Sequence, residues 1–467
     1  MYNKLVKDLL SKIKIVLASI LILLISCSSN TNEEIKEPPV FKSSIPADND
    51  ENVSLSTQIE ISFNEVVHLV ANHGITLNNN TVEIEEAHTK ILIITALEKD
   101  QTYVVNIPKG SLVNVEGVPL AEGIQFSFST EKSITVDLSQ TLVTPNPSSE
   151  VVNVYNFLLE NYGDKTISAA MSNVAWNTNE AEWVKQHTGK YPAMTTVDYI
   201  FVHYSPANWI DYNNIDFIED WWNNNGLFSA SWHWNVPISQ GSEEYAFYSE
   251  NNNFSAANAT VEGTWENNVI KADLEEIVGY LKLLKEKNIP VIWRPLHEAA
   301  GNIYEYQDGT AWFWWGNDGA EAYKKLWVYM FDYFKEQGLN NLIWVWTTQT
   351  KDNDFYPGDE YVDMVGRDIY NNTDASSIAE EFASIQQQYP TKMITLSEMG
   401  SVTNISAQWS AGVKWSYFMP WYDNERTNNP ADAAFSQTNH QHADANWWKD
   451  AMGNSAVITR DEMPSLK

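Results

Sequence analysis

From about Thr141 onward the sequence repeats one pattern, in which a short apolar run precedes a longer stretch that is apolar on one helical face. Residues 272–287 and 323–337 show this helical spacing most clearly. Alternating strands and helices predict a parallel α/β fold. We count eight apolar runs and predict strands at residues 167–175, 199–203, 227–234, 291–296, 342–346, 364–369, 393–397 and 415–419. Eight strands in this order predict a (β/α)8 TIM barrel over residues 141–467.

Two of the predicted strands end in a glutamate. Glu298 follows the fourth strand, and Glu398 follows the seventh. The active site of a TIM barrel lies at the C-terminal ends of its strands, and these two strands lie on opposite sides of the barrel. Their end residues can therefore face each other across the mouth, and two carboxylates are the minimum equipment for cleaving a glycosidic bond. The competing interpretation is that each glutamate merely caps a strand or pairs with an arginine.

The charge and the aromatic content narrow the class of partner. The formal net charge is −32, which argues against nucleic acid, because a phosphate-binding surface needs clustered Lys and Arg. The 20 Trp and 22 Tyr residues exceed what a core of this size requires. Aromatic faces stack on the apolar faces of sugar rings, although many of these rings must simply fill the core. A neutral polysaccharide is the partner that fits both observations.

Residues 40–132 have a different texture. Residues 58–63 alternate polar and apolar side chains as a half-buried strand does, and residues 90–95, 102–107 and 125–128 repeat the pattern. Turn signals separate these runs, which predicts a small all-β sandwich in front of the barrel. The region resembles the bacterial Ig-like domains of secreted proteins. We find no catalytic cluster in it and interpret it as a spacer.

The N-terminal residues resemble an export signal. Four lysines within residues 4–14 precede the apolar run 15–25, which is too short to span a membrane and predicts a signal peptide at residues 1–26. The single cysteine excludes an intrachain disulfide. Its surroundings resemble the lipobox of bacterial lipoproteins, which implies that Cys27 carries a lipid and that residues 27–39 form a tether. Ser28, rather than Asp, implies the outer membrane, at the cell surface or facing the periplasm.

The motifs around the two glutamates are similar to those of glycoside hydrolase family 26, which is dominated by endo-β-1,4-mannanases. Residues 293–301 and the Trp-Phe-Trp-Trp-Gly run at 312–316 are the most specific parts of this resemblance. Residues 231–234, 365–370, 396–400 and 456–460 match in the same order. The resemblance covers residues 142–466. It implies a retaining hydrolase of β-mannan, galactomannan or glucomannan that needs no cofactor and no metal.

The resemblance also assigns roles to single residues. It implies that Glu298 is the acid/base and that Glu398 is the nucleophile. The implied substrate-binding residues are His233, His297, Trp312, Tyr370, Trp421, Arg294 and Asp368. Of these, the histidines would hydrogen-bond the sugar that is attacked, Arg294 and Asp368 would hold the wall around the glutamates, and Tyr370 would donate to the nucleophile. The two tryptophans would form platforms for sugar rings.

Alternatives remain open. β-1,3-Xylan and mixed-linkage β-glucan are possible substrates, because relatives of this family act on them. A non-catalytic, surface glycan-binding lipoprotein is the alternative from another functional class. One departure from the family pattern is the long insert at residues 302–311, which would close one end of the cleft or add Tyr304 and Tyr306 as further platforms.

Overall fold

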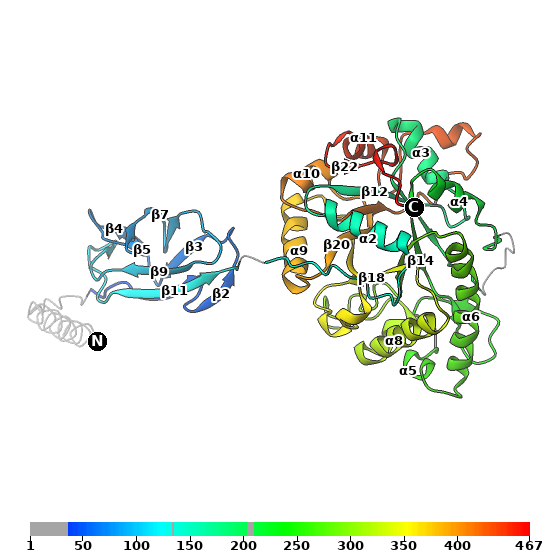
Figure 1. Ribbon diagram of the computed structural model, residues 1–467. Coiled ribbons are helices and arrows are strands. Elements are labelled where there is room, and N and C mark those ends of the chain that lie inside the picture. The colour runs from blue at the N-terminus through cyan, green and yellow to red at the C-terminus, as the bar shows by residue number, and fades with distance from the viewer. Residues whose placement is uncertain (1–35, 133–134, 203–209) are drawn as a thin grey trace, which may run out of the picture. The chain divides into compact units, whose positions relative to one another are not determined.

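The computed structural model describes residues 36–132, 135–202 and 210–467. The chain forms two compact units that divide after Ser133, and each is described here by itself (Figure 1). The expected signal peptide, the lipidation site Cys27 and most of the tether lie outside the described residues. Within the described ranges, no helix is long and apolar enough to cross a membrane.

Over residues 36–132, the regular elements of the N-terminal unit are all strands. A four-stranded sheet has the order β1-β3-β8-β7, a five-stranded sheet has the order β2-β11-β9-β5-β6, and β4 pairs with β10. Alternate residues of β3 point into a shared apolar core with residues of β9 and β11, as a sandwich requires. The predicted all-β domain is confirmed. Its strands are β1 (Phe41–Ile45), β2 (Asp50–Val53), β3 (Ile59–Phe63), β4 (Val67–Leu69), β5 (Thr76–Leu77), β6 (Asn80–Thr81), β7 (Glu83–Ala87), β8 (Lys90–Ile94), β9 (Thr102–Ile107), β10 (Leu112–Asn114) and β11 (Ile124–Thr130).

The second unit is a closed barrel of eight parallel strands. Each strand pairs with the next along the chain, and β12 pairs with both β13 and β21, which closes the ring. The predicted TIM barrel is confirmed. The strands are β12 (Thr166–Met171), β13 (Met194–Asp198), β14 (Leu227–Trp232), β17 (Val291–Pro295), β18 (Leu342–Thr348), β19 (Met364–Tyr370), β20 (Met393–Gly400) and β21 (Tyr417–Pro420). Three short strands lie outside the ring: β15 (Val236–Pro237), β16 (Tyr245–Ala246) and β22 (Val457–Ile458).

The second barrel strand is not where the sequence predicted it. Residues 199–203 were expected because they begin with an apolar run, but β13 ends at Asp198. Thr195 and Thr196 are buried in this strand, and the Thr195 hydroxyl lies 2.5 Å from that of Ser172. A barrel interior accepts a polar side chain that finds a hydrogen-bond partner, as Thr195 does, whereas the Thr196 hydroxyl has none among the described residues. A strand that is polar in sequence is thus buried in the structure. The apolar residues that follow turn back and pack into the core instead.

Helices surround the barrel (Figure 1). Helix α6 buries Leu274, Ile277, Val278, Leu281 and Leu284 on one face, in agreement with the predicted spacing. The helices are α2 (Ser149–Asn161), α3 (Asn179–Thr188), α4 (Asp216–Asn223), α5 (Ala256–Ala259), α6 (Trp265–Glu286), α7 (Trp314–Asn317), α8 (Ala320–Glu336), α9 (Ala375–Gln388), α10 (Ile405–Ser410) and α11 (Ala445–Gly453). Single 3-10 turns are η1 (Asn353–Phe355), η2 (Asp359–Tyr361), η3 (Ala433–Ser436) and η4 (Arg460–Glu462).

One buried carboxylate fastens the segment before α2 to the barrel. Asp363 is only 2% exposed, and its two oxygens accept hydrogen bonds from the backbone N–H groups of Val143 and Trp344, both at 2.8 Å. Trp344 lies in β18, so this side chain joins a strand to residues far from it in the sequence. Each buried N–H that loses its partner carries a desolvation cost.

We therefore expect Asp363→Ala to lower the free energy of unfolding by about 3 kcal/mol, since it leaves the buried N–H of Trp344 and the N–H of half-buried Val143 without their acceptor. Chemical denaturation followed by tryptophan fluorescence measures this change. The exposed Asp332 on α8 provides a matched control, and Asp332→Ala should leave the unfolding midpoint of the barrel unchanged. Equal midpoints for the two variants would contradict the assigned role of Asp363.

Candidate active site

The turn that carries Glu298 is held in an unusual backbone conformation. Leu296 and Glu298 have φ values of 49° and 50°, in the left-handed region that costs a residue with a side chain about 1 kcal/mol. The turn is fixed by hydrogen bonds to its carbonyls. Trp315 Nε1 donates to the carbonyl of His297 at 2.9 Å, and the Tyr323 hydroxyl donates to that of Leu296 at 3.0 Å.

The tryptophan-rich run at 312–316 packs directly on this turn. Trp314 and Trp315 are fully buried, so they support the turn and are not sugar platforms. A Cβ atom at Gly316 would lie 1.7 Å from the carbonyl oxygen of Ala299. Only glycine allows this approach, which explains why the motif ends in that residue.

Glu398 lies on β20 and is held by two donors. The Tyr370 hydroxyl donates to Oε1 at 2.6 Å, and the Arg294 guanidinium donates to Oε2 at 2.5 Å. Arg294 is 1% exposed and also donates to Asp368 at 2.8 Å, while Ser397 donates to the other oxygen of Asp368 at 2.6 Å. Two carboxylates therefore share one buried cation.

The two glutamates sit in different electrostatic surroundings. Burial, together with the charges of Asp368 and Glu398, raises the pKa of Glu298 well above its ordinary value. Burial also raises the pKa of Glu398, but Arg294 and the Tyr370 hydroxyl oppose this shift. Glu298 is thus the carboxyl that keeps its proton to higher pH, and Glu398 is the one that ionises first.

A buried aspartate orients the two histidines. Asp198 accepts from the backbone N–H of His233 at 2.9 Å and lies 2.5 Å from its Nδ1. The carboxylate favours a proton on Nδ1, which leaves Nε2 of His233 to accept from Nε2 of His297 at 3.1 Å. Burial, followed by the charge of Arg294, lowers the pKa of His297 well below its ordinary value, so His297 is neutral. Its Nδ1 is then an unprotonated acceptor, and this buried atom has no hydrogen-bond partner among the described residues.

The strand ends surround a cavity of about 630 Å³. Seven of the predicted site residues line it: Glu298, Glu398, His233, Asp368, Tyr370, Trp312 and Trp421. Arg294 and His297 do not line it but lie buried behind its wall. The described residues contain no cluster of three or more His, Cys, Asp or Glu side chains arranged to hold a metal ion.

The sequence did not single out several residues of the cavity wall. These are Val174, Ile200, Phe247, Tyr248, Glu305, Phe313, Gln349, Thr350, Arg367 and Tyr422. Phe313 and Arg367 lie inside motifs that had been recognised, and Gln349 directly follows a strand end. Their positions could have identified these three residues as candidates. Phe247 and Tyr248 come from a long loop, and nothing in the sequence marks them as residues of the cavity.

The insert at 302–311 contributes a carboxylate to the cavity. Glu305 lines it, whereas Tyr304 and Tyr306 are not among the lining residues. The Tyr304 hydroxyl donates to Asp354, and its ring lies 6.2 Å from that of Phe355. Tyr306 is 61% exposed. The expectation that these two rings extend the row of sugar platforms does not fit this arrangement.

The model of glycosyl hydrolase family 26 matches residues 143–458. The chain belongs to glycosyl hydrolase family 26. The predicted family is therefore confirmed. Residues 35–130 match the model of a bacterial Ig-like domain, which confirms that prediction as well.

Several proteins that are named as mannanases are similar to this chain. Mannan endo-1,4-beta-mannosidase B from Piromyces sp is 32% identical over 345 residues, which cover 72% of this chain and 56% of that protein. The chain thus spans about half the length of this relative. The family 26 domain of an endo-beta-mannanase/endo-beta-glucanase from Prevotella bryantii is 36% identical, with a TM-score of 0.63, and the match covers 70% of this chain and 99% of that domain. A beta-mannanase from a symbiotic protist of the termite Reticulitermes speratus, complexed with gluco-manno-oligosaccharide, is 35% identical, with a TM-score of 0.60 and coverage of 70% and 99%.

The hydrogen bond from Tyr370 favours the ionised form of Glu398, so its removal should raise the pKa of that carboxyl. If family 26 chemistry requires ionised Glu398, Tyr370→Phe should move the acidic limb of kcat/KM to higher pH by about one unit. The measurement is the pH profile of kcat/KM. Tyr248→Phe removes a hydroxyl from the same cavity without touching either glutamate and should leave both limbs in place. An acidic limb that stays unmoved in Tyr370→Phe would refute the role of this bond.

Proposed function

We propose that the protein is a retaining glycoside hydrolase that cleaves internal β-1,4-mannosidic bonds of mannan-type polysaccharides. The observation that carries this proposal is the pair Glu298 and Glu398. Both side chains line one cavity. Their different surroundings raise the pKa of Glu298 further than that of Glu398, so Glu398 ionises first. Two carboxyl groups with separated pKa values are what acid and nucleophile roles require.

In this mechanism Glu398 attacks the anomeric carbon while Glu298 gives its proton to the leaving oxygen. A covalent glycosyl-enzyme forms, and Glu298, now ionised, takes a proton from the water that hydrolyses it. Arg294 and Tyr370 hold Glu398 ionised and aimed. Glu398 loses its charge when the covalent bond forms in the first step. The pKa of Glu298 then falls, because the negative charge of Glu398 no longer raises it, and this suits the change of Glu298 from acid to base.

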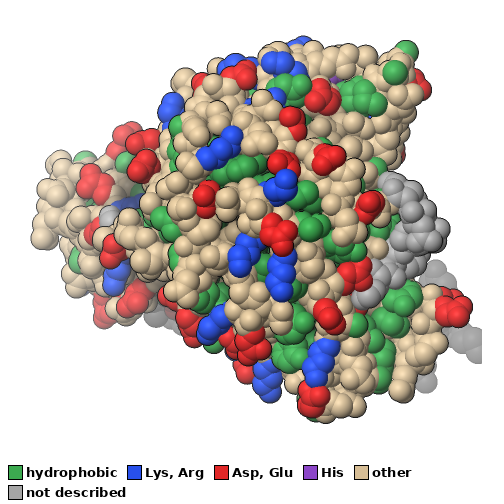
Figure 2. All heavy atoms as spheres, turned by 45° about the vertical axis from the view of Figure 1, so that its right-hand side comes forward, with side chains coloured by type: hydrophobic (Ala, Val, Ile, Leu, Met, Phe, Trp, Pro, Cys, Tyr) green, Lys and Arg blue, Asp and Glu red, His purple; other side chains and the backbone are tan. Residues whose placement is uncertain are grey.

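The walls of the cavity suit a neutral sugar chain. Trp312 is 36% exposed, and Trp421 also lines the cavity, so each can offer a face to a sugar ring. His233, which Asp198 and His297 hold in place, lines the same cavity beside the glutamates. Figure 2 shows Lys and Arg side chains interspersed with Asp and Glu over one face of the barrel, with no basic patch for a polyanion. The similar proteins are named as mannanases, and we extend that substrate class to this chain.

We also propose that Cys27 anchors the protein in the outer membrane, with the barrel facing the outside. This proposal rests on the lysines, the apolar run and the lipobox-like residues that precede Cys27. A lipid on this residue, followed by the polar tether and the Ig-like domain, would hold the barrel away from the membrane. An enzyme that acts on large external polysaccharides would gain from that position.

Glu398→Ala should lower turnover of linear mannan by about 10⁴-fold or more, because the nucleophile is lost. Glu298→Ala should lower it by about 10²–10⁴-fold but spare aryl β-mannosides whose leaving group needs no proton. Reducing-sugar release and aryl release measure the two effects, and NMR of the first product should show the β anomer.

Glu305→Ala is the matched control, since Glu305 lines the same cavity but is assigned neither the acid/base role nor the nucleophile role. It should keep turnover within about tenfold of the native protein. Unchanged turnover in Glu398→Ala, or an α anomer as first product, would exclude the retaining mechanism. A panel with β-1,3-xylan and mixed-linkage β-glucan tests the substrate independently.

Cys27→Ala should move the protein from the membrane fraction of a Gram-negative host to the soluble fraction, because the acylated residue is lost. Fractionation followed by immunoblotting measures this. Ser28→Ala is the control and should leave the protein in the outer membrane. If Cys27→Ala remained with the membrane, the proposed anchor would be wrong.

A further inference from the structure

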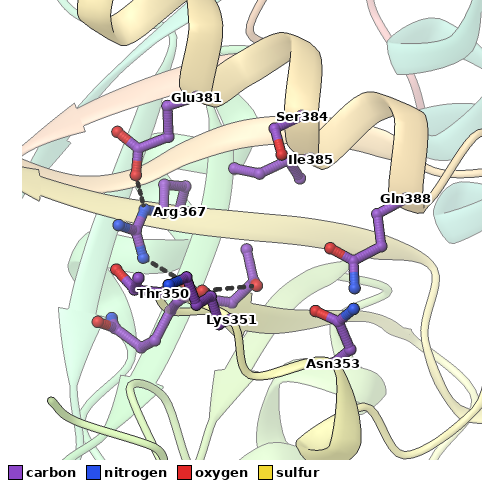
Figure 3. Close-up of a pocket in the computed structure, with 10 residues that line it drawn as sticks. Thr350, Lys351, Asn353, Arg367, Glu381, Ser384, Ile385 and Gln388 are labelled. Carbon is purple, nitrogen blue, oxygen red and sulfur yellow. Dashed lines mark hydrogen bonds and ion pairs between the residues drawn. The ribbon is translucent and has the colours of Figure 1, made fainter. Parts of the chain in front are cut away.

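A second cavity lies beside the active site. Its volume is about 390 Å³, and it lies between the loop that follows β18 and one face of helix α9 (Figure 3). Gln349, Thr350 and Arg367 line this cavity and the active-site cavity as well. The two cavities therefore share one wall, and a ligand that occupies one lies next to a ligand in the other.

The second cavity carries polar side chains that the protein itself does not use. Asn353 and Gln388 present carboxamides, and Thr350 and Ser384 present hydroxyls. None of these four side chains forms a hydrogen bond with another described residue, and none of them has a further interaction of another kind. Figure 3 shows the carboxamides of Asn353 and Gln388 pointing toward each other at one end of the cavity. These groups offer both donors and acceptors to a ligand rich in hydroxyls.

At the other end of the cavity, the guanidinium of Arg367 is paired within the protein. Arg367 donates from Nε to Glu381 and from Nη1 to the carbonyl of Thr348 at 3.0 Å (Figure 3). This ion pair neutralises the guanidinium, whereas Lys351, which also lines the cavity, is exposed and forms no ion pair with a described residue. Ile385 supplies an apolar surface on the side of α9. An uncharged ligand with hydroxyls and one apolar face fits this lining, and a hexopyranose has both.

We propose that the second cavity binds one neutral hexopyranose unit of the polysaccharide that occupies the active-site cavity. The inference rests on the proposed function, because the shared wall is what places the sugar there. The unit comes either from the main chain, as it continues past Gln349 and Thr350, or from a single-sugar branch on it. Both sources present the same chemistry to the carboxamides and hydroxyls, and substrates with and without branches distinguish them.

The test uses two substitutions at exposed positions of α9, one that fills the cavity and one that removes a polar group from it. Ser384→Trp should fill it, and Gln388→Ala should remove one carboxamide. Each variant of the full chain should lower kcat/KM on its preferred long substrate by about tenfold, the effect expected for the loss of one or two hydrogen bonds. The substrates are linear mannohexaose, galactosyl-substituted mannan and an aryl β-mannobioside, which is too short to reach the cavity and should be turned over unchanged.

Gln387 supplies matched controls, because it is exposed on the same helix, next to Gln388, and does not line the cavity. Gln387→Trp and Gln387→Ala should behave as the native protein does. A loss on both long substrates assigns the cavity to the main chain, and a loss on the branched substrate alone assigns it to a branch.

The proposal is overturned if the Ser384 and Gln388 variants match the Gln387 variants on every substrate, or if they lose activity on the aryl β-mannobioside to the same extent. Gln388→Ala shortens one exposed side chain and decides the matter if Ser384→Trp folds poorly. A native protein that cleaves none of the three substrates overturns the proposed function, and the sugar site with it. If the native protein cleaves these substrates and the Ser384 and Gln388 variants are as active as the Gln387 variants, the sugar site is overturned but the proposed function is not.

Discussion

The site depends on one buried cation. Arg294 comes from β17, Asp368 from β19 and Glu398 from β20, and the guanidinium joins the three strands out of reach of water. Removing such a group from water costs several kcal/mol, which only well-placed partners offset. The three strands must therefore reach the correct register before the ion pairs form, so folding and assembly of the site are the same event. Burial, together with the net negative charge left after pairing, holds the proton on Glu298.

A second layer of support comes from aromatic packing rather than charge. The turn at 296–298 adopts a backbone conformation that these residues would not choose alone. Buried indole and phenol groups donate to its carbonyls, and Gly316 lets the tryptophan-rich run approach it. Some of the aromatic side chains that first suggested sugar stacking, Trp315 and Tyr323 among them, thus hold a strained turn in place. Among the tryptophans that the structure describes, only Trp312 and Trp421 line the active-site cavity.

The sequence predicted the barrel, seven of its eight strands and both glutamates, because these features repeat locally or end a strand in a recognisable motif. It misplaced the second strand, since Thr195 and Thr196 look exposed in the sequence, whereas the structure buries both and pairs the Thr195 hydroxyl with that of Ser172. The same error hid Asp198, which ends that strand and orients His233. Phe247 and Tyr248 were missed for another reason. They reach the cavity from a long loop whose course depends on tertiary packing, and no periodicity marks such residues.

The hydrogen bond from Tyr304 to Asp354 has a consequence for engineering. It ties the insert at 302–311, which supplies Glu305 to one cavity, to the segment that begins with Asn353 and lines the other. The segments that line the two cavities are thus joined by this hydrogen bond, in addition to the wall that the cavities share. If the insert at 302–311 were grafted onto another barrel without Asp354, it would lose this hydrogen bond. The insert and the segment that carries Asp354 should therefore be transferred together.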